Sequence, residues 1–247
     1  MFARFTAGEI EAAYKTRHNP VTEADRTVDA LLRRHLLRDG EGWLSEESVD
    51  DRTRLDKTRV WVVDPLDGTL EFVAGIPEFC ASVALVDNGR PVAGGIYNPA
   101  TNQLFLGSLG TGVTLNGTPV AASRKNNLAG ALILASRSER KRGEWKQFEH
   151  APFRVQPMGS VAYKLALVAA GVADATFTLR PKHEWDVAAG VALVEAAGGF
   201  VSAPDGAPLP FNRLQPRLSG LLACGMPLRD ELLSLINTSL PASARRP

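Results

Sequence analysis

The sequence has little cysteine, no excess of charge of one sign and no long apolar run, and each absence excludes a class of protein. Its 247 residues include only Cys80 and Cys224, too few and too far apart for a disulfide framework or a cysteine-rich zinc site. The 28 Lys and Arg nearly balance the 27 Asp and Glu, which argues against a protein that coats nucleic acid or an anionic membrane. The longest apolar stretch, residues 161–173, is interrupted by Lys164 and falls short of the about 20 residues that span a bilayer. We therefore expect a cytoplasmic protein with no membrane segment and no nucleic-acid partner.

An ordinary globular composition remains. Apolar residues make up 45% and charged residues 22% of the chain, so it can bury a core without disulfides or a structural metal. The length lies between one large domain and two small ones. The pattern of predicted elements therefore has to decide how the chain is divided.

The first half of the chain predicts two helices followed by an antiparallel meander. Residues 7–16 are typical of a short helix, and Asn19-Pro20 ends it, because a residue before proline avoids helical backbone angles. A second helix is predicted from Thr22, where Thr22 and Asp25 match a capping box. Apolar runs separated by turn residues predict strands at 60–63, 79–86, 91–97, 103–106 and 112–115.

The pattern changes near residue 128, after which strands and helices alternate. Strands are predicted at 131–135, 175–179, 200–202 and 221–223, and helices at 161–170, 187–196 and 228–236. We therefore predict an α/β (α+β) protein with two domains. Residues 1–128 would form an α+β domain with the antiparallel sheet, and residues 129–247 an α/β domain.

The most distinctive feature is a group of acidic residues around the first predicted strand. Asp64 and Asp67 follow the apolar run at 60–63 in the sequence Asp-Pro-Leu-Asp-Gly-Thr, and Glu46 and Glu47 lie in a predicted loop before it. Two carboxylates at the end of a buried strand repel each other and are costly to desolvate. A divalent cation relieves both costs, and ligands that are all oxygen favour Mg²⁺. The alternative is a simple turn, since Asp, Pro and Gly are common turn residues.

A second acidic element lies at the start of the predicted helix 187–196. Asp186 directly precedes this helix, so it can cap the helix, and it can also ligate metal if it faces the same cleft. At the first element, Gly68 lets the backbone approach a ligand, and Thr69 adds a hydroxyl and an N–H group. A helix that begins there would direct free N–H groups at an anion.

Together these segments resemble the inositol monophosphatase superfamily of Mg²⁺-dependent, lithium-sensitive phosphomonoesterases. The matching segments, in family order, are residues 20–25 (PVTEAD), 45–48 (SEES), 61–69 (WVVDPLDGT), 159–160 (GS), 185–190 (WDVAAG) and 195–199 (EAAGG). The resemblance implies a layered αβαβα sandwich of the inositol monophosphatase and fructose-1,6-bisphosphatase type, whose two halves meet at the active site. It also implies two to three Mg²⁺ ions and a small phosphorylated metabolite as substrate.

The resemblance further implies a set of metal ligands that are all oxygen atoms: Glu46, Asp64, the carbonyl of Leu66, Asp67 and Asp186. The first three would hold one ion, and Asp64 with the last two would hold a second. A third, weaker ion would lie near Glu46 through water molecules. Glu47 is the alternative to Glu46 if the register of the loop differs.

Catalytic roles also follow from the resemblance. Glu46 and Thr69 would orient the attacking water, and Asp25 would hydrogen-bond to Thr69, unless Asp25 serves only its capping box. The N–H groups of Gly68 and Thr69 would hold the phosphate. The implied chemistry is direct in-line attack by water without a phosphoenzyme.

The substrate is less well constrained. Many inositol and sugar-phosphate members carry an acidic residue seven positions before the second-domain Asp, where this chain has Leu179. The residues after Thr69 read Leu-Glu-Phe, which is more similar to the 3′(2′),5′-bisphosphate nucleotidase branch. Ser160 and Lys164 also resemble that branch, in which they can approach a second phosphate or the ribose.

Two more candidate substrate contacts lie beside the second acidic element, namely His183 and Glu184, with Lys182 next to them. We favour a bisphosphate nucleotidase, and the alternative is a phosphatase of inositol 1-phosphate or of another sugar or histidinol phosphate. A rival of another class is a non-catalytic regulatory binding protein on the same scaffold. A decayed enzyme of that kind should have lost a carboxylate, and this chain retains the set.

The resemblance also bears on assembly and on the N-terminus. Relatives are often dimers, so a homodimer is possible. They usually have a full helix before the segment that begins here at Pro20. A shortened helix should expose apolar surface, which a partner could cover.

Overall fold

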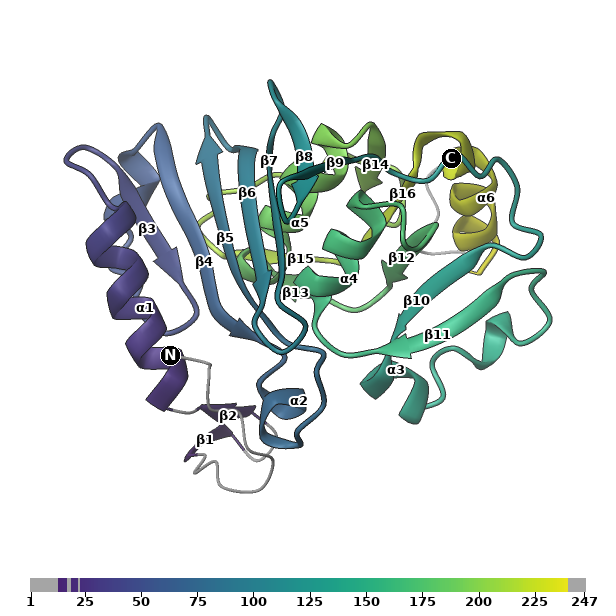
Figure 1. Ribbon diagram of the computed structural model, residues 1–247, viewed down its shortest axis with the longest axis horizontal. Coiled ribbons are helices and arrows are strands. Elements are labelled where there is room, and N and C mark those ends of the chain that lie inside the picture. Colours follow the sequence, from purple (N-terminus) through teal and green to yellow (C-terminus); the bar gives the residue numbers. More distant parts are fainter. Residues whose placement is uncertain (1–12, 17–18, 22, 240–247) are drawn as a thin grey trace.

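Alternating layers of helix and sheet make up the chain, as the ribbon in Figure 1 shows. The computed structural model describes residues 13–16, 19–21 and 23–239. The helices of the layers are, in order across the molecule, α1 (Glu23–Leu36), then α4 (Val161–Ala169) with α5 (Glu184–Ala196), then α6 (Arg229–Ser239). A seven-stranded sheet separates the first helix from the central pair, and a five-stranded sheet separates that pair from the last helix. The predicted αβαβα order is confirmed.

The larger sheet is the predicted meander with one parallel strand added at its edge. Its strands, in spatial order, are β3 (Gly42–Ser45), β4 (Arg59–Asp67), β5 (Cys80–Asp87), β6 (Arg90–Asn98), β7 (Gln103–Ser108), β8 (Gly112–Leu115) and β9 (Thr118–Val120). Only β3 and β4 run parallel, and all other neighbours are antiparallel. The sequence did not predict β3, which is too short to show a period. It predicted β4 to end at Val63, whereas the strand continues to Asp67.

The smaller sheet is mixed and confirms the predicted alternation of strand and helix. Its spatial order is β11 (Arg154–Met158), β10 (Leu132–Ser136), β12 (Ala175–Thr178), β16 (Leu221–Gly225) and β14 (Gly199–Ser202). The remaining elements are the strand pairs β1 (Ala13–Thr16) with β2 (Asn19–Val21) and β13 (Lys182–His183) with β15 (Arg217–Leu218), the helices α2 (Thr69–Val73) and α3 (Arg137–Lys141), and the 3₁₀ turns η2 (Thr53–Asp56), η3 (Lys146–Phe148) and η4 (Met226–Leu228).

The central helices are buried between the two sheets, so one core joins both halves of the chain. Residues of α4 and α5 share an apolar cluster with β4, β5 and β6. A helix that is apolar on all sides is typical of such a position. The approach is close: a Cβ atom on Gly94 of β6 would lie 2.5 Å from the carbonyl oxygen of Ala189. This contact fixes α5 against the larger sheet and thereby places its N-terminus.

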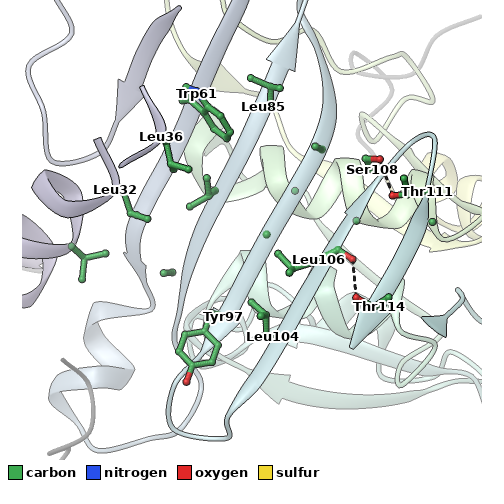
Figure 2. A pocket seen from close by; sticks show the side chains of 18 of the residues that line it. Leu32, Leu36, Trp61, Leu85, Tyr97, Leu104, Leu106, Ser108, Thr111 and Thr114 are labelled. Carbon is green, nitrogen blue, oxygen red and sulfur yellow. Dashed lines mark hydrogen bonds between the residues drawn. The ribbon is translucent and has the colours of Figure 1, made fainter. Parts of the chain in front are cut away.

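The outer face of the larger sheet carries an apolar groove beside α1, which Figure 2 shows from close by. The groove has a volume of about 850 Å³ and lies over β4 to β8. Leu104 and Leu106 line it and are exposed. The helix expected at residues 7–16 is wrong at Ala13–Thr16, which pair as a strand with β2, and residues 7–12 lie outside the described part of the chain.

The change from one sheet to the other falls between Val120 and Leu132. The predicted boundary after residue 128 lies in this connection, and it stays a prediction because the two halves share a core. Within the described ranges, no helix is both long and apolar enough to cross a membrane.

Candidate active site

The parallel pairing of β3 and β4 brings the first two carboxylates together. Ser45 pairs with Val63, so the residues that follow, Glu46 and Asp64, come next to each other along the two strands. The N–H of Glu46 continues this pairing and donates to the carbonyl of Val63 at 3.3 Å. Strands that run parallel present their carboxyl ends at one sheet edge. The unpredicted strand β3 is therefore what places Glu46 beside Asp64.

A bulge in β4 puts Asp64 and Asp67 on one face of the sheet. Residues three apart in a regular strand point to opposite faces. Here Asp64 pairs with Ser82 and Asp67 with Cys80, so β4 has one residue more than β5 over this stretch. Such an extra residue is a β-bulge, and proline, which cannot donate to the ladder, is tolerated at one. The Pro-Leu pair between the two aspartates thus turns Asp67 toward the same side as Asp64.

The N-terminus of α5 brings the third carboxylate. Carboxylate oxygens of Glu46, Asp64 and Asp186 all lie within 4.8 Å of one another, and the described residues do not place Glu47 in this group. Asp186 lies in the first turn of α5, where its Oδ2 accepts the N–H of His183 at 2.9 Å. Its role at the helix end is therefore that of a residue inside the first turn, not the predicted N-cap.

The cluster is electrostatically unfavourable without a cation. Burial raises the pKa of Asp64 well above its ordinary value, and the charges of Glu46, Asp67 and Asp186 raise it further. Burial, followed by the charge of Asp67, raises the pKa of Asp186 to about 8. Like charges at this spacing are held together when a metal ion neutralises them. The donor set, which is oxygen throughout, fits a hard divalent cation.

Asp67 lies beside this cluster and is held from the second half of the chain. Its Oδ2 accepts the hydroxyl of Ser160 at 2.7 Å and the N–H of Ala162 at 2.6 Å, at the start of α4. The Ser160 hydroxyl is buried and also accepts the N–H of Tyr163. Ser160 is thus committed to Asp67 and to the helix end, in place of the expected substrate contact. Asp67 itself stays a predicted ligand.

The Gly68-Thr69 turn begins a short helix, as the sequence predicts. Gly68 has φ 95° and precedes α2, and a Cβ atom there would lie 2.7 Å from the carbonyl oxygen of Glu78. Only glycine combines this angle with this contact at little cost. The Thr69 hydroxyl donates to the carbonyl of Leu66 at 3.0 Å. Its proton therefore points at the predicted carbonyl ligand and not at Asp25, which is buried in the first turn of α1.

Two other expected substrate contacts are buried and serve the fold. The ammonium group of Lys164 donates to the carbonyls of Ser160, Gly159 and Met158 at 2.9, 3.2 and 3.5 Å, which uses its three protons. The carboxylate of Glu184 is fully buried and accepts two backbone N–H groups from the segment at residues 212–213, at 2.8 and 3.0 Å. Neither group faces the carboxylate cluster with a free polar atom. We assign both to structural positions, which corrects the sequence prediction.

His183 is exposed and stacks on Trp185 with ring centroids 4.5 Å apart. Partial burial of the imidazole lowers the pKa of His183, and the nearby charges of Arg217 and Lys182 lower it further. Its contact with substrate stays a prediction. Leu179 packs against the core of the smaller sheet, so its position presents no carboxylate for substrate hydroxyls.

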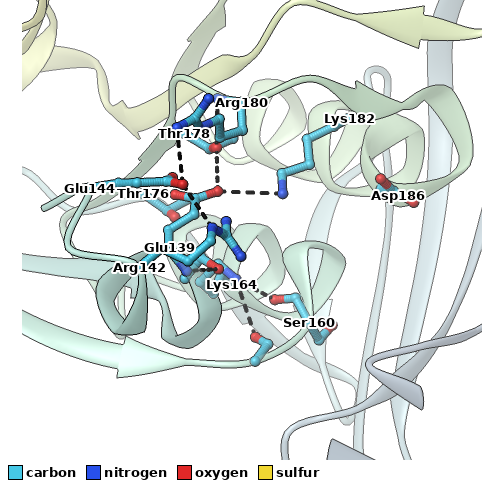
Figure 3. A network of polar contacts seen from close by, with 12 residues as sticks. Glu139, Arg142, Glu144, Ser160, Lys164, Thr176, Thr178, Arg180, Lys182 and Asp186 are labelled. Atoms are coloured by element: carbon cyan, nitrogen blue, oxygen red, sulfur yellow. Dashed lines mark hydrogen bonds and ion pairs between the residues drawn. The ribbon is translucent and has the colours of Figure 1, made fainter. Parts of the chain in front are cut away.

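Sequence reasoning missed a second polar cluster, which Figure 3 shows beside Asp186. Glu139 is buried, and its carboxylate accepts the Thr178 hydroxyl at 2.6 Å and the Trp145 indole N–H at 3.3 Å. Lys182 pairs with the same carboxylate at 3.4 Å. Glu139 comes from α3, far along the chain from Lys182, and no local pattern signals the contact.

The chain is similar to proteins of one known family. The inositol monophosphatase family profile matches residues 2–238. Inositol monophosphatase 3 of Solanum lycopersicum is 35% identical over 94% of this chain and 92% of its own, and Nus factor SuhB of Xylella fastidiosa is 35% identical over 93% and 86%. The solved inositol monophosphatase of Anabaena (Nostoc) sp. PCC 7120 superposes with TM-score 0.75 and 34% identity, covering 90% of this chain and 88% of that one. The chain therefore belongs to the inositol monophosphatase family of metal-dependent phosphoric monoester hydrolases.

Proposed function

We propose that this protein hydrolyses a small phosphate monoester with two to three Mg²⁺ ions. The observation that carries the proposal is the group of three carboxylates, Glu46, Asp64 and Asp186, whose oxygens lie within 4.8 Å of one another. These residues, with Asp67 and the carbonyl of Leu66, would hold the ions. Bound metal would supply an activated nucleophile at neutral pH and neutralise charge on the leaving oxygen.

The residues of the chain would position the reacting groups. Glu46 and the Thr69 hydroxyl would orient the attacking water in line with the phosphorus atom. Gly68 and Thr69 would direct backbone N–H groups at the phosphate, because the first N–H groups of a helix have no partner within the helix. Ser160 would keep Asp67 in place through the 2.7 Å hydrogen bond between them. Catalysis of phosphoryl transfer rests mainly on such positioning and on charge stabilisation.

Two substrate classes have support. Inositol 1-phosphate is the first, because relatives that share about a third of this sequence over most of its length are named inositol monophosphatases. A 3′(2′),5′-bisphosphate nucleotide is the second. Lys164 no longer supports it, since its protons are used by backbone carbonyls, but the Leu-Glu-Phe segment and the cation Lys182 near Asp186 do.

Release of inorganic phosphate from a panel of phosphomonoesters with Mg²⁺ tests the proposal. The panel includes inositol 1-phosphate, adenosine 3′,5′-bisphosphate, histidinol phosphate and fructose 1,6-bisphosphate. Hydrolysis of at least one of these is expected, and millimolar Li⁺ should inhibit it. An enzyme that releases phosphate from none of them would contradict the proposal.

A non-catalytic regulatory role is the candidate from another class. One relative is named Nus factor SuhB, which is the reason to retain it. Hydrolysis that disappears when a single carboxylate of the cluster is neutralised would exclude a purely regulatory role. The complete carboxylate set favours catalysis.

Location and assembly also stay proposals. Cys80 and Cys224 are both buried and free, which supports a reducing compartment such as the cytoplasm. A homodimer is proposed from the resemblance alone, and sedimentation of the purified chain would test it.

A further inference from the structure

The side chain of Lys182 is held at a fixed place beside the carboxylate cluster. Its backbone is anchored because Lys182 pairs with Leu218 in the short strands β13 and β15, directly before α5. Figure 3 shows its ammonium group directed toward Glu139, with Asp186 on the other side of the Lys182 side chain. Burial raises the pKa of Asp186, and the charge of Lys182 is close enough to oppose that rise. A cation therefore stands near the metal ligands without being part of them.

The partner of Lys182 is satisfied without it. The Glu139 carboxylate accepts one hydrogen bond from Thr178 and one from Trp145, so these neutral donors fix it in place. The contact from Lys182 is longer, at 3.4 Å, and uses one of the three ammonium protons. Lys182 keeps 18% of its side chain exposed, whereas Lys164 is buried and has its protons used. Lys182 can therefore donate to a bound anion.

The surroundings of Lys182 decide from which side an anion can approach. The cavity between Lys182, Glu139 and Lys164 has a volume of only about 10 Å³, room for at most one water molecule. A phosphate or carboxylate cannot enter there, so it must approach Lys182 from the side away from Glu139, on which Figure 3 shows Asp186. Leu179, which precedes Lys182 in the chain, packs against the core and offers no acceptor for substrate hydroxyls.

We propose that Lys182, held by Glu139, is a specificity residue that binds a second anionic group of the substrate while the first phosphate lies on the carboxylate cluster. This inference rests on the proposed phosphatase function and narrows its substrate class. The second group can be a phosphate or a carboxylate, because the recognition is by charge and hydrogen bonding. A phosphomonoester with such a group would be preferred over the same compound without it.

Matched substrates and variants test this inference. The value of kcat/KM is measured for adenosine 3′,5′-bisphosphate and for adenosine 3′-phosphate, with inositol 1-phosphate as a third substrate. Lys182→Met removes the charge, Lys182→Arg keeps it, and Lys146→Met, on the exposed η3 turn, is a control for the net charge. The dissociation constants of the two nucleotides are measured in parallel with Ca²⁺ in place of Mg²⁺.

Lys182→Met should lower the preference for the bisphosphate over the monophosphate by about 10- to 100-fold, in kcat/KM and in binding, because a charge-assisted hydrogen bond is lost. Rates with the two single phosphates should stay within about twofold, and Lys182→Arg should keep most of the preference. An unchanged preference in Lys182→Met, or an equal loss for all three substrates, would overturn the inference. If no compound is hydrolysed, the proposed function fails. The dissociation constants of the two nucleotides would still test the role of Lys182.

Discussion

Two polar clusters lie near the N-terminus of α5, and their buried charges are balanced in different ways. In one, the carboxylates of Glu46, Asp64 and Asp186 approach within 4.8 Å. In the other, the Glu139 carboxylate is surrounded by hydrogen-bond donors and paired with Lys182. The second cluster is balanced within the chain, so it contributes to the fold. The first is balanced only when a cation joins it, and this difference marks it as the functional site.

The largest expected effect comes from neutralising the unbalanced cluster. Asp64→Asn keeps the oxygen that accepts the Leu66 N–H at 3.0 Å but removes a ligand charge. Phosphate release should fall by about 10³-fold or more, since bound metal contributes several kcal/mol to the transition state. Steady-state hydrolysis of the best substrate of the panel measures this. Loss of circular-dichroism signal would mean that the variant had failed to fold, and Asp87→Asn, at the end of β5, serves as the matched control.

A substitution in the balanced cluster around Glu139 should lower the stability of the protein. Glu139→Leu leaves Thr178 and Trp145 without their acceptor and Lys182 without its counter-ion. We expect a loss of about 2 to 4 kcal/mol in the free energy of unfolding, and this range already allows for the partial exposure of Lys182. Asp64→Asn, without metal, should be as stable as the wild type or more so. Urea unfolding in EDTA compares the two variants, and equal losses in both would remove the contrast between the clusters.

The pH dependence of stability sharpens the same comparison. The pKa values of Asp64 and Asp186 are raised in the folded protein, the latter from 3.8 to about 8. At a pH between the unfolded and the folded pKa of these groups, the folded state binds more protons than the unfolded state. The two groups therefore stabilise the metal-free fold fully below pH 4, and this contribution is lost as the pH rises toward 8. Thermal unfolding between pH 5 and 8 should show a slope that saturating Mg²⁺ or Asp64→Asn reduces. A slope that neither change affects would mean that other titratable groups determine the pH dependence of stability.

A smaller effect is expected from a change of backbone geometry beside the unbalanced cluster. Gly68→Ala places a Cβ atom where φ is 95° and where the Glu78 carbonyl oxygen is 2.7 Å away. We expect a loss of about 1 to 2 kcal/mol in stability together with weaker phosphate binding. Urea unfolding and the KM of the best substrate measure the two effects. Gly117→Ala is the control, because its φ is 81° but no atom lies within 4 Å.

The sequence predicted the parts of this site that depend on local pattern and on family motifs. The helices α1, α4, α5 and α6, the meander and the acidic segments all have such signals, and Asp64, Asp67 and Asp186 stand at the ends of recognisable elements. Composition and periodicity do not reveal the parallel strand β3 or the bulge in β4, and these two features bring Glu46, Asp64 and Asp67 to one face.

The polar side chains around the site were harder to predict, because their roles depend on burial. Lys164 and Glu184 look like substrate contacts in the sequence, yet the structure directs both at backbone groups. Glu139 reaches Lys182 and Thr178 although all three residues lie far apart along the chain, on α3, β13 and β12. Contacts of this kind have no signature in a single sequence.

The most direct test of the account is the Mg²⁺ dependence of phosphate release by the wild type and by Asp64→Asn, measured side by side. The account predicts saturable, Mg²⁺-dependent hydrolysis by the wild type and release near background by Asp64→Asn at every Mg²⁺ concentration. The same Mg²⁺ dependence and rate in both proteins would show that the Glu46, Asp64 and Asp186 cluster does not hold the catalytic metal.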